Sequence, residues 1–293
     1  WHKPHNFIFA IWFFSKIELT GCSPFFPPIL SKFSNRFGFT GTLPPDNLDK
    51  WNIFGKIGPQ LYEKKAYELR DDNYVAKSKV HVLELTYNTP TAEIYHGTNS
   101  SAYYLQENEF IRNSEYRNTL IANLCNKLDN NGLILVDYIE HGELLLEALQ
   151  LICKHKDVYF IQGSVDIEQR KDIQNYMEAQ KNVIVIAISK IFSTGINIKN
   201  LHYIVFAGGG KAKIKIVQSI GRGLRLHIDK KELIIFDIAD NLRYGQRHAE
   251  QRLTLYDSEQ IKYTFTQFTY VNNIQLETFF CLIFGKVKPF FFG

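Results

Sequence analysis

Residues 132–137 read Gly132-Leu133-Ile134-Leu135-Val136-Asp137, and this stretch decides the fold class. Four consecutive apolar residues without alternation are typical of a strand that is buried on both faces of a sheet. Such strands occur mainly in parallel sheets, where helices cover both faces. The stretch therefore predicts an interior strand of an α/β domain.

The segments on either side of this strand alternate between expected helices and expected strands. Short apolar runs predict strands at 77–85, 132–137, 158–161, 183–188, 202–206 and 233–238, and helical periodicity predicts helices at 112–128, 143–153, 167–177 and 214–224. Strands separated by helices of about ten residues or more form right-handed βαβ units. The pattern predicts a three-layer α/β domain with a parallel sheet over about residues 80–240.

A separate strand and helix are expected nearer the N-terminus. Residues 36–45 predict a buried strand that ends in a tight loop. Asp46 or Asn47 is then in position to cap a helix that contains Leu48, Trp51 and Phe54.

The composition is that of an ordinary globular protein. The chain has 293 residues, of which 45% are hydrophobic and 22% charged, and its net charge of +4 permits a nucleic-acid partner without requiring one. The positive charge is concentrated at 211–231, where seven Lys and Arg residues accompany a single acid, Asp229. The cysteines Cys22, Cys125, Cys153 and Cys281 form no CxxC pair. Reduced thiols are therefore expected rather than a zinc site or disulfides.

The loops after the strands are the places to look for a functional site, because ligands of an open parallel sheet bind beyond the carboxyl ends of its strands. After the expected strand at 202–206, the chain continues into a helix that contains Gln218-Ser219-Ile220-Gly221-Arg222-Gly223-Leu224-Arg225. Arg222 and Arg225 are three positions apart and so project from one helix face. Their planar guanidinium groups suit a polyphosphate, although an isolated pair of this kind is more often a solvated surface feature.

Four segments together carry a family resemblance. Gln218-x-x-Gly221-Arg222-x-x-Arg225 resembles motif VI of superfamily 2 helicases, and Ser193-Thr194-Gly195-Ile196-Asn197 resembles motif V. The segment 133–137 resembles motif IV, and Thr40-Gly41-Thr42 resembles motif III. Over about residues 36–253 the chain is similar to the second RecA-like domain of these helicases, and at 192–201 to UvsW-type phage DNA helicases. Four motifs in the correct order are more specific than any single one.

The resemblance implies a role for each matching residue. Arg222 and Arg225 are implied as the catalytic arginine-finger residues. The implied ATP contacts are Gly195, Asn197, Gln218, Arg222 and Arg225. The implied nucleic-acid contacts are Gly163, Ser164, Ser193, Thr194 and Lys211, and those implied in coupling are Thr40, Gly41 and Thr42. Ser164 or Asp166 is equally suited to capping the next helix.

The phosphate-binding half of an ATP site is not found in the sequence. Gly208-Gly209-Gly210-Lys211 does not match Walker A, because Val205 stands at the first glycine position and Ala212 follows the lysine. No Asp-Glu box occurs either. The resemblance places these elements in the first RecA-like domain. We expect ATP and Mg²⁺ as cofactors of a full-length parent, no metal ligand in this chain, and no appreciable ATPase activity from this chain alone.

Three regions are expected: 1–79 as an irregular segment with the tail of the first RecA-like domain, 80–255 as the second RecA-like domain, and 256–293 as a tail. The apolar ends are candidates for foreign sequence and are too short to span a bilayer. The expected partners are a nucleic acid, which the resemblance implies to be DNA, and the first RecA-like domain. The expected location is the cytosol of a bacterial host or of a phage-infected cell. Asp237 and Asp240, after the last expected strand, are expected to be structural acids, and the histidines to be solvated or hydrogen-bonded.

Two alternatives remain open. One is a non-catalytic nucleic-acid-binding module that uses the same basic segment. The other is an unrelated α/β nucleotide-binding or transferase domain, which the fold alone does not exclude. A Rossmann enzyme has GxGxxG after its first strand, and none follows Asp137, which weakens the second alternative.

Overall fold

The computed structural model describes residues 12–13, 38–39, 43, 46–63, 77–89, 91–97, 100–162, 167–189, 200–208 and 232–269. The chain divides into two compact units, residues 1–64 and 65–293.

The first unit contains two short strands and one helix. Strand β1 (Trp12–Phe13) pairs in parallel with β2 (Gly38–Phe39), and α2 spans Asn47–Ile57. The Asp46 carboxylate accepts hydrogen bonds from the backbone amides of Leu48 and Asp49. Asp46 is therefore the N-cap of α2. The sequence had indicated either Asp46 or Asn47 for this position.

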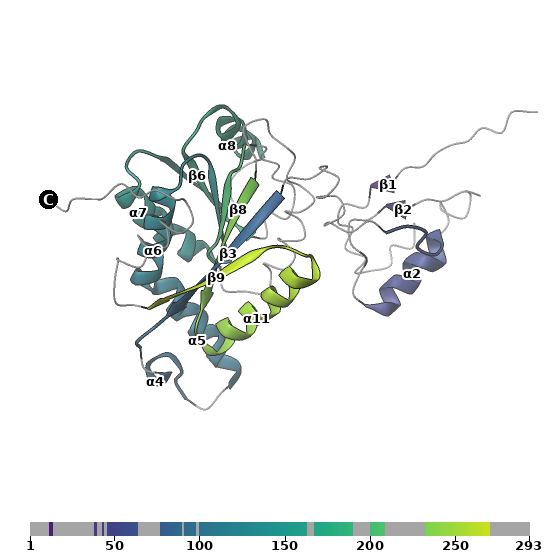
Figure 1. The fold of residues 1–293 in the computed structure, drawn as a ribbon, viewed down its shortest axis with the longest axis horizontal. Helices are drawn as coiled ribbons and strands as arrows, with labels where there is room; N and C mark the ends of the chain where they lie inside the picture. Colours follow the sequence, from purple (N-terminus) through teal and green to yellow (C-terminus); the bar gives the residue numbers. More distant parts are fainter. Residues whose placement is uncertain are drawn as a thin grey trace, which may run out of the picture. The chain divides into compact units, whose positions relative to one another are not determined.

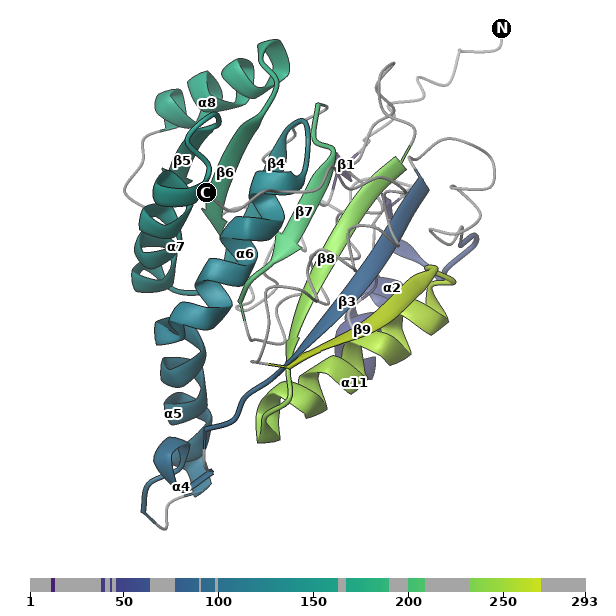
Figure 2. The ribbon, with the colours of Figure 1, turned by 60° about the vertical axis from the view of Figure 1, so that its left-hand side comes forward.

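The second unit is built around a seven-stranded sheet (Figures 1 and 2). In spatial order the strands are β5 (Asp157–Ile161), β6 (Val183–Ile188), β4 (Gly132–Val136), β7 (Tyr203–Phe206), β8 (Glu232–Asp240), β3 (Lys77–Thr86) and β9 (Tyr263–Thr269). The described helices are α4 (Thr91–Ile94), α5 (Ser100–Asn113), α6 (Glu115–Lys127), α7 (Ile139–Ile152), α8 (Ile167–Ala179) and α11 (Arg243–Ser258). Every strand pair in this sheet is parallel.

Strand β4 lies in the interior of the sheet, and all five of its residues are buried. Leu133 and Leu135 belong to the core on the face covered by α8 and α11. Ile134 and Val136 belong to the core on the opposite face, covered by α6 and α7. The expected three-layer α/β architecture with a parallel sheet is confirmed.

Three features differ from the expected elements. Helix α5 occupies a stretch that the sequence indicated only as polar, and the helix expected at 112–128 begins as α6 after its N-cap, Ser114. The strand series, expected to end at 238, continues through α11 to β9, which pairs with β3 and lies beyond the boundary expected at residue 255. Strand β9 is at the sheet edge and only Phe268 in it is buried, so it lacks the apolar run of a central strand.

Two of the four cysteines lie in the described part of the chain. Cys125 and Cys153 are buried there and form no disulfide. Burial raises the pKa of the Cys153 thiol to about 11, so this group is protonated at neutral pH. This agrees with the expected reduced thiols at these two positions. Cys22 and Cys281 lie outside the described residues.

His81 makes folding dependent on pH. Its side chain in β3 is 1% exposed, stacks on Phe236 and has Nδ1 2.6 Å from Oγ1 of Thr264. Burial, with a smaller contribution from Lys79, lowers the pKa of His81 from 6.5 to about 4. The unfolded chain therefore binds this proton more tightly than the folded one. The resulting stability is fully present above pH 6.5 and is lost as the pH falls through about 4.

Because of His81, we expect the free energy of unfolding of the wild-type chain to fall by about 3 kcal/mol between pH 7 and pH 4. His81→Gln should remove that part of the pH dependence. Urea denaturation over this pH range measures it, with exposed His155→Gln as the matched control. Parallel pH profiles for wild type and His81→Gln would contradict the assignment.

Candidate functional site

The carboxyl ends of the parallel strands lie at one edge of the sheet. Asp137 follows β4 there, and Gly208 follows the neighbouring β7. The amide of Gly208 donates a hydrogen bond to the carbonyl of Leu135 at 3.0 Å. A Cβ on Gly208 would lie 2.5 Å from Oδ2 of Asp137, so only glycine fits without displacement. The chain after β7 thus leaves the sheet in close contact with Asp137.

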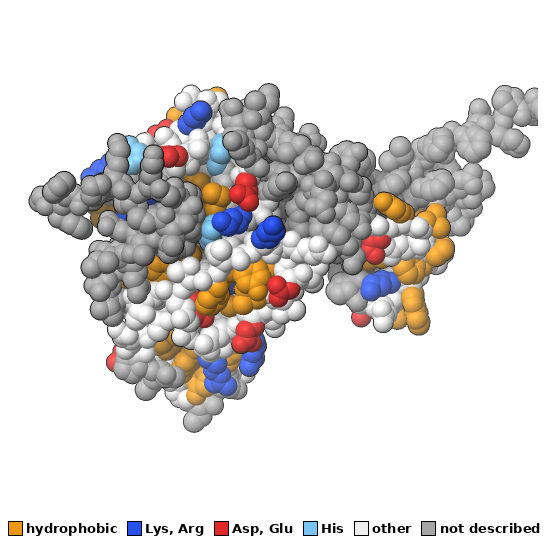
Figure 3. Space-filling model, viewed as in Figure 1, with side chains coloured by type: hydrophobic (Ala, Val, Ile, Leu, Met, Phe, Trp, Pro, Cys, Tyr) orange, Lys and Arg blue, Asp and Glu red, His pale blue; other side chains and the backbone are white. Residues whose placement is uncertain are grey.

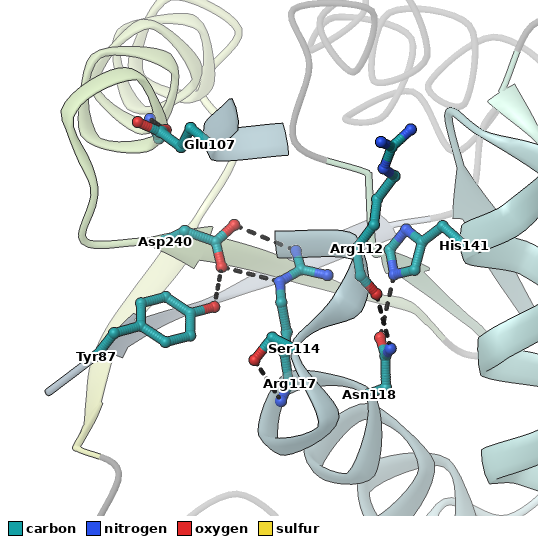
Figure 4. A network of polar contacts seen from close by, with 9 residues as sticks. Tyr87, Glu107, Arg112, Ser114, Arg117, Asn118, His141 and Asp240 are labelled. Atoms are coloured by element: carbon teal, nitrogen blue, oxygen red, sulfur yellow. Dashed lines mark hydrogen bonds and ion pairs between the residues drawn. The ribbon is translucent and has the colours of Figure 1, made fainter. Parts of the chain in front are cut away.

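A buried ion pair ties together three elements at this edge (Figure 4). Arg117, in the first turn of α6, donates from Nε to Oδ1 of Asp240 at 2.8 Å and from Nη2 to Oδ2 at 3.2 Å. The hydroxyl of Tyr87, just after β3, donates to Oδ1 of the same carboxylate at 2.6 Å. The Arg117 side chain is 0% exposed and that of Asp240 is 2% exposed. This pair fixes the start of α6 against the ends of β3 and β8.

The charges of this pair stabilise each other. Burial alone would lower the pKa of Arg117, but the Asp240 carboxylate and the Tyr87 side chain together more than offset burial, and the pKa lies above its ordinary value. Burial and the same carboxylate raise the pKa of the Tyr87 hydroxyl, which therefore remains a donor. Arg117 therefore remains positively charged and paired with Asp240.

A second buried pair lies further back in β8. Nε of Arg252 donates to Oδ2 of Asp237 at 2.7 Å, and the hydroxyl of Tyr256 donates to the same oxygen at 2.8 Å. Asp237 and Asp240 are therefore structural acids, as expected. They lie within β8 rather than after it.

The junction of α5, α6 and α7 holds the chain that follows β4. Asn118 donates to the carbonyl of Arg112 at 3.0 Å, and its Oδ1 lies 3.1 Å from Nε2 of His141. The Arg112 guanidinium lies 4.3 Å from the centroid of the Tyr138 ring and 3.7 Å from the Glu140 carboxylate. His141 is hydrogen-bonded and buried, as expected for a structural histidine.

Glu107 of α5 caps the start of α11. Its carboxylate accepts from the amide of Gly245 at 2.6 Å and from that of Tyr244 at 3.0 Å. The residue before α11, Leu242, provides no side-chain cap, so this buried carboxylate supplies the negative group that a helix N-terminus favours. A Cβ on Gly245 would lie 2.4 Å from the carbonyl oxygen of Asp240, so glycine is required there.

The site residues expected from the sequence all lie outside the described residues. They are Thr40, Gly41, Thr42, Gly163, Ser164, Ser193, Thr194, Gly195, Asn197, Lys211, Gln218, Arg222 and Arg225. The described strands show where the later segments leave the sheet: 163–166 follow β5, 190–199 follow β6, and 209–231 follow β7. Each of these segments begins at the carboxyl edge.

The described groups at this edge do not by themselves suit a triphosphate with its metal ion. In the ranges that the structure describes, no group of three or more His, Cys, Asp or Glu side chains could hold a metal. The Asp240 carboxylate at the end of β8 is buried in its pair with Arg117, and the side chain that follows β4, Asp137, is acidic rather than basic. The Lys and Arg side chains that a triphosphate requires are concentrated in the sequence at 211–231.

Comparison with known proteins shows that part of the chain is similar to helicases. Residues 115–227 match the family described as "Helicase conserved C-terminal domain". The chain is 28% identical over 257 residues to the ATP-dependent DNA helicase uvsW of Enterobacteria phage T4, covering 80% of this chain and 50% of the relative. It therefore spans half the length of that relative.

Solved structures agree with this comparison. The crystal structure of T4 UvsW has a TM-score of 0.55 at 28% identity, over 66% of this chain and 41% of that one. The ATP-dependent Type ISP restriction-modification enzyme LlaBIII, bound to DNA, has a TM-score of 0.51 at 12% identity, over 77% of this chain and 18% of that one, and shows the fold alone. The fold is RecA-like. No helix in the described ranges has both the length and the hydropathy that a membrane crossing requires.

Proposed function

We propose that the chain carries the C-terminal RecA-like domain of a UvsW-like superfamily 2 helicase, and that it supplies the arginine-finger side of an ATP site completed by a first RecA-like domain. The parent enzyme would couple ATP hydrolysis to movement on nucleic acid. DNA is the proposed substrate, because the relative is a DNA helicase. The proposed location is the cytosol.

One observation carries the proposal: β5, β6, β4 and β7 are adjacent in the sheet and parallel. The segment with Gly163 and Ser164 follows β5, and the segment that resembles motif V follows β6. The segment with Arg222 and Arg225 follows β7. Three segments that resemble helicase motifs therefore start from neighbouring strand ends. This is the edge at which an open parallel sheet binds ligands.

The proposed roles divide between nucleotide and nucleic acid. Arg222 and Arg225 would stabilise charge that develops on the γ-phosphate, and Gly195, Asn197 and Gln218 would contact the nucleotide. Contacts with nucleic-acid phosphates are assigned to Gly163, Ser164, Ser193, Thr194 and Lys211. The coupling segment is Thr40, Gly41 and Thr42. The β- and γ-phosphates and Mg²⁺ would be held by the first domain.

Complementation in trans tests the proposal. The chain alone is expected to show no ATPase above background. Addition of the first RecA-like domain of a UvsW-type helicase should produce ATP hydrolysis that single-stranded DNA stimulates, measured as phosphate release. ATPase activity of the chain alone would contradict the assignment of phosphate binding to the other domain. DNA binding without ATPase in any combination would favour the non-catalytic nucleic-acid-binding module.

A further inference from the structure

Tyrosine and arginine side chains lie together on the surface formed by α5 and the first turns of α11. The Arg243 guanidinium lies 5.5 Å from the ring centroid of Tyr103 and 5.6 Å from that of Tyr244. The Arg247 guanidinium lies 5.9 Å from the Tyr244 centroid. We call Tyr103, Tyr244, Arg243 and Arg247 the tyrosine–arginine face. In Figure 3, Lys and Arg side chains lie beside hydrophobic ones at the lower end of the larger unit, where Figure 1 places α5 and the start of α11.

The tyrosine–arginine face carries positive charge that is available to a partner. Arg243 and Arg247 are both exposed, and among the described residues neither forms an ion pair. A cation–π contact at an exposed site contributes about 0.5–1 kcal/mol, which orients a guanidinium without neutralising it. The nearest acid along this helix, Glu250, is exposed on the turn after Arg247. On α11 the two arginines thus outnumber the exposed acid, and the carboxylate of Glu107 between α5 and α11 is buried.

Contacts with neighbouring residues hold the aromatic rings of the tyrosine–arginine face in place. The Tyr104 ring packs edge-on against Tyr244, with the ring centroids 5.5 Å apart. The hydroxyl of Tyr103 donates to the carbonyl of Gly97 at 2.5 Å. Glu107, between these helices, accepts from the backbone of Tyr244 and also from the hydroxyl of Tyr95. A partner would therefore meet rings that are already ordered, which lowers the entropic cost of binding.

The tyrosine–arginine face lies at the same edge of the sheet as the proposed site. Helix α11 begins three residues after Asp240, the last residue of β8.

We propose that the tyrosine–arginine face binds single-stranded DNA, with bases stacked on its tyrosine rings and guanidinium planes and phosphates paired with Arg243 and Arg247. Aromatic rings interleaved with cations suit a single strand, because every base has a face that stacks and every nucleotide has a phosphate. This inference rests on the proposed function. It extends the DNA contact to a surface that contains none of the motif residues.

Binding of a fluorescein-labelled single-stranded oligonucleotide to the full chain tests the proposal. Tyr103→Leu and Tyr244→Leu should each weaken binding about 5- to 150-fold, since stacking contributes about 1–3 kcal/mol per base. The double variant Arg243→Ala/Arg247→Ala should reduce the slope of log affinity against log salt by about 1.4, corresponding to two phosphate contacts. These losses would support both halves of the proposal.

Matched controls lie at the opposite, amino edge of the sheet. Tyr176→Leu removes a partly exposed tyrosine, and Lys154→Ala/Lys181→Ala removes two exposed positive charges. Both control variants should bind like the wild type. Circular dichroism checks that each variant is folded. If Tyr244→Leu were unfolded, the exposed arginine variant would still decide the question.

Crosslinking separates the outcomes. Ultraviolet crosslinking of bromodeoxyuridine-containing DNA should map to peptides with Tyr103 or Tyr244. Wild-type binding by the variants, with crosslinks elsewhere, would overturn this inference and leave the proposed function intact. Absence of DNA binding by the wild-type chain would overturn the inference as well. The proposed function would fail too only if trans complementation also gave no ATPase.

Discussion

Arg225→Ala is expected to lower DNA-stimulated ATP hydrolysis in the trans-complementation assay by about 10³–10⁵-fold, the range over which an arginine finger acts in related phosphoryl-transfer systems. The proposed finger places a planar cation against charge that develops in the transition state. Its removal should therefore reduce the catalytic rate far more than nucleotide affinity. Phosphate release at saturating ATP measures the rate, and titration of a fluorescent ATP analogue measures the affinity.

Two control variants make this result specific. Arg225→Lys keeps the charge but loses the forked donor geometry, so it should recover only part of the activity. Lys181→Ala removes an exposed charge at the amino edge of the sheet and should leave the rate unchanged. Activity that persists in Arg225→Ala would remove the arginine-finger assignment from this residue.

The central sheet could be predicted because its interior strands leave a strong mark in the sequence. The strand at 132–136 is buried on both faces, and its uninterrupted apolar run follows directly from that burial. The edge strand β9 has only Phe268 buried, and α5 mixes polar residues with tyrosines that contact other tyrosines. Neither element has the periodicity on which the prediction depended, so both were missed.

The polar network at the carboxyl edge was also missed, although one signal for it was present. Arg117 precedes Ile121 and Leu124 at helical spacing, so a charged residue occupies the apolar face of α6. Such a position requires a buried partner of opposite charge. The sequence does not reveal which acid this is, because Asp240 lies 123 residues away and only the pairing of β8 with β3 and β7 brings it to that end of the sheet.

Arg117→Met is expected to destabilise the larger unit by about 3–5 kcal/mol, because it leaves the Asp240 carboxylate buried with Tyr87 but without its cation. The double variant Arg117→Met/Asp240→Leu should lose clearly less, since no uncompensated charge remains. Urea denaturation followed by circular dichroism measures both.

The control is Glu140→Ala, because the Glu140 side chain at 3.7 Å from Arg112 is 79% exposed. Its salt bridge is screened by solvent and should contribute no more than about 1 kcal/mol. An equal loss in the single and double variants would mean that the cost comes from packing around the Arg117 side chain. A smaller loss in the double variant would show that the cost of Arg117→Met comes from leaving the buried Asp240 carboxylate without its cation.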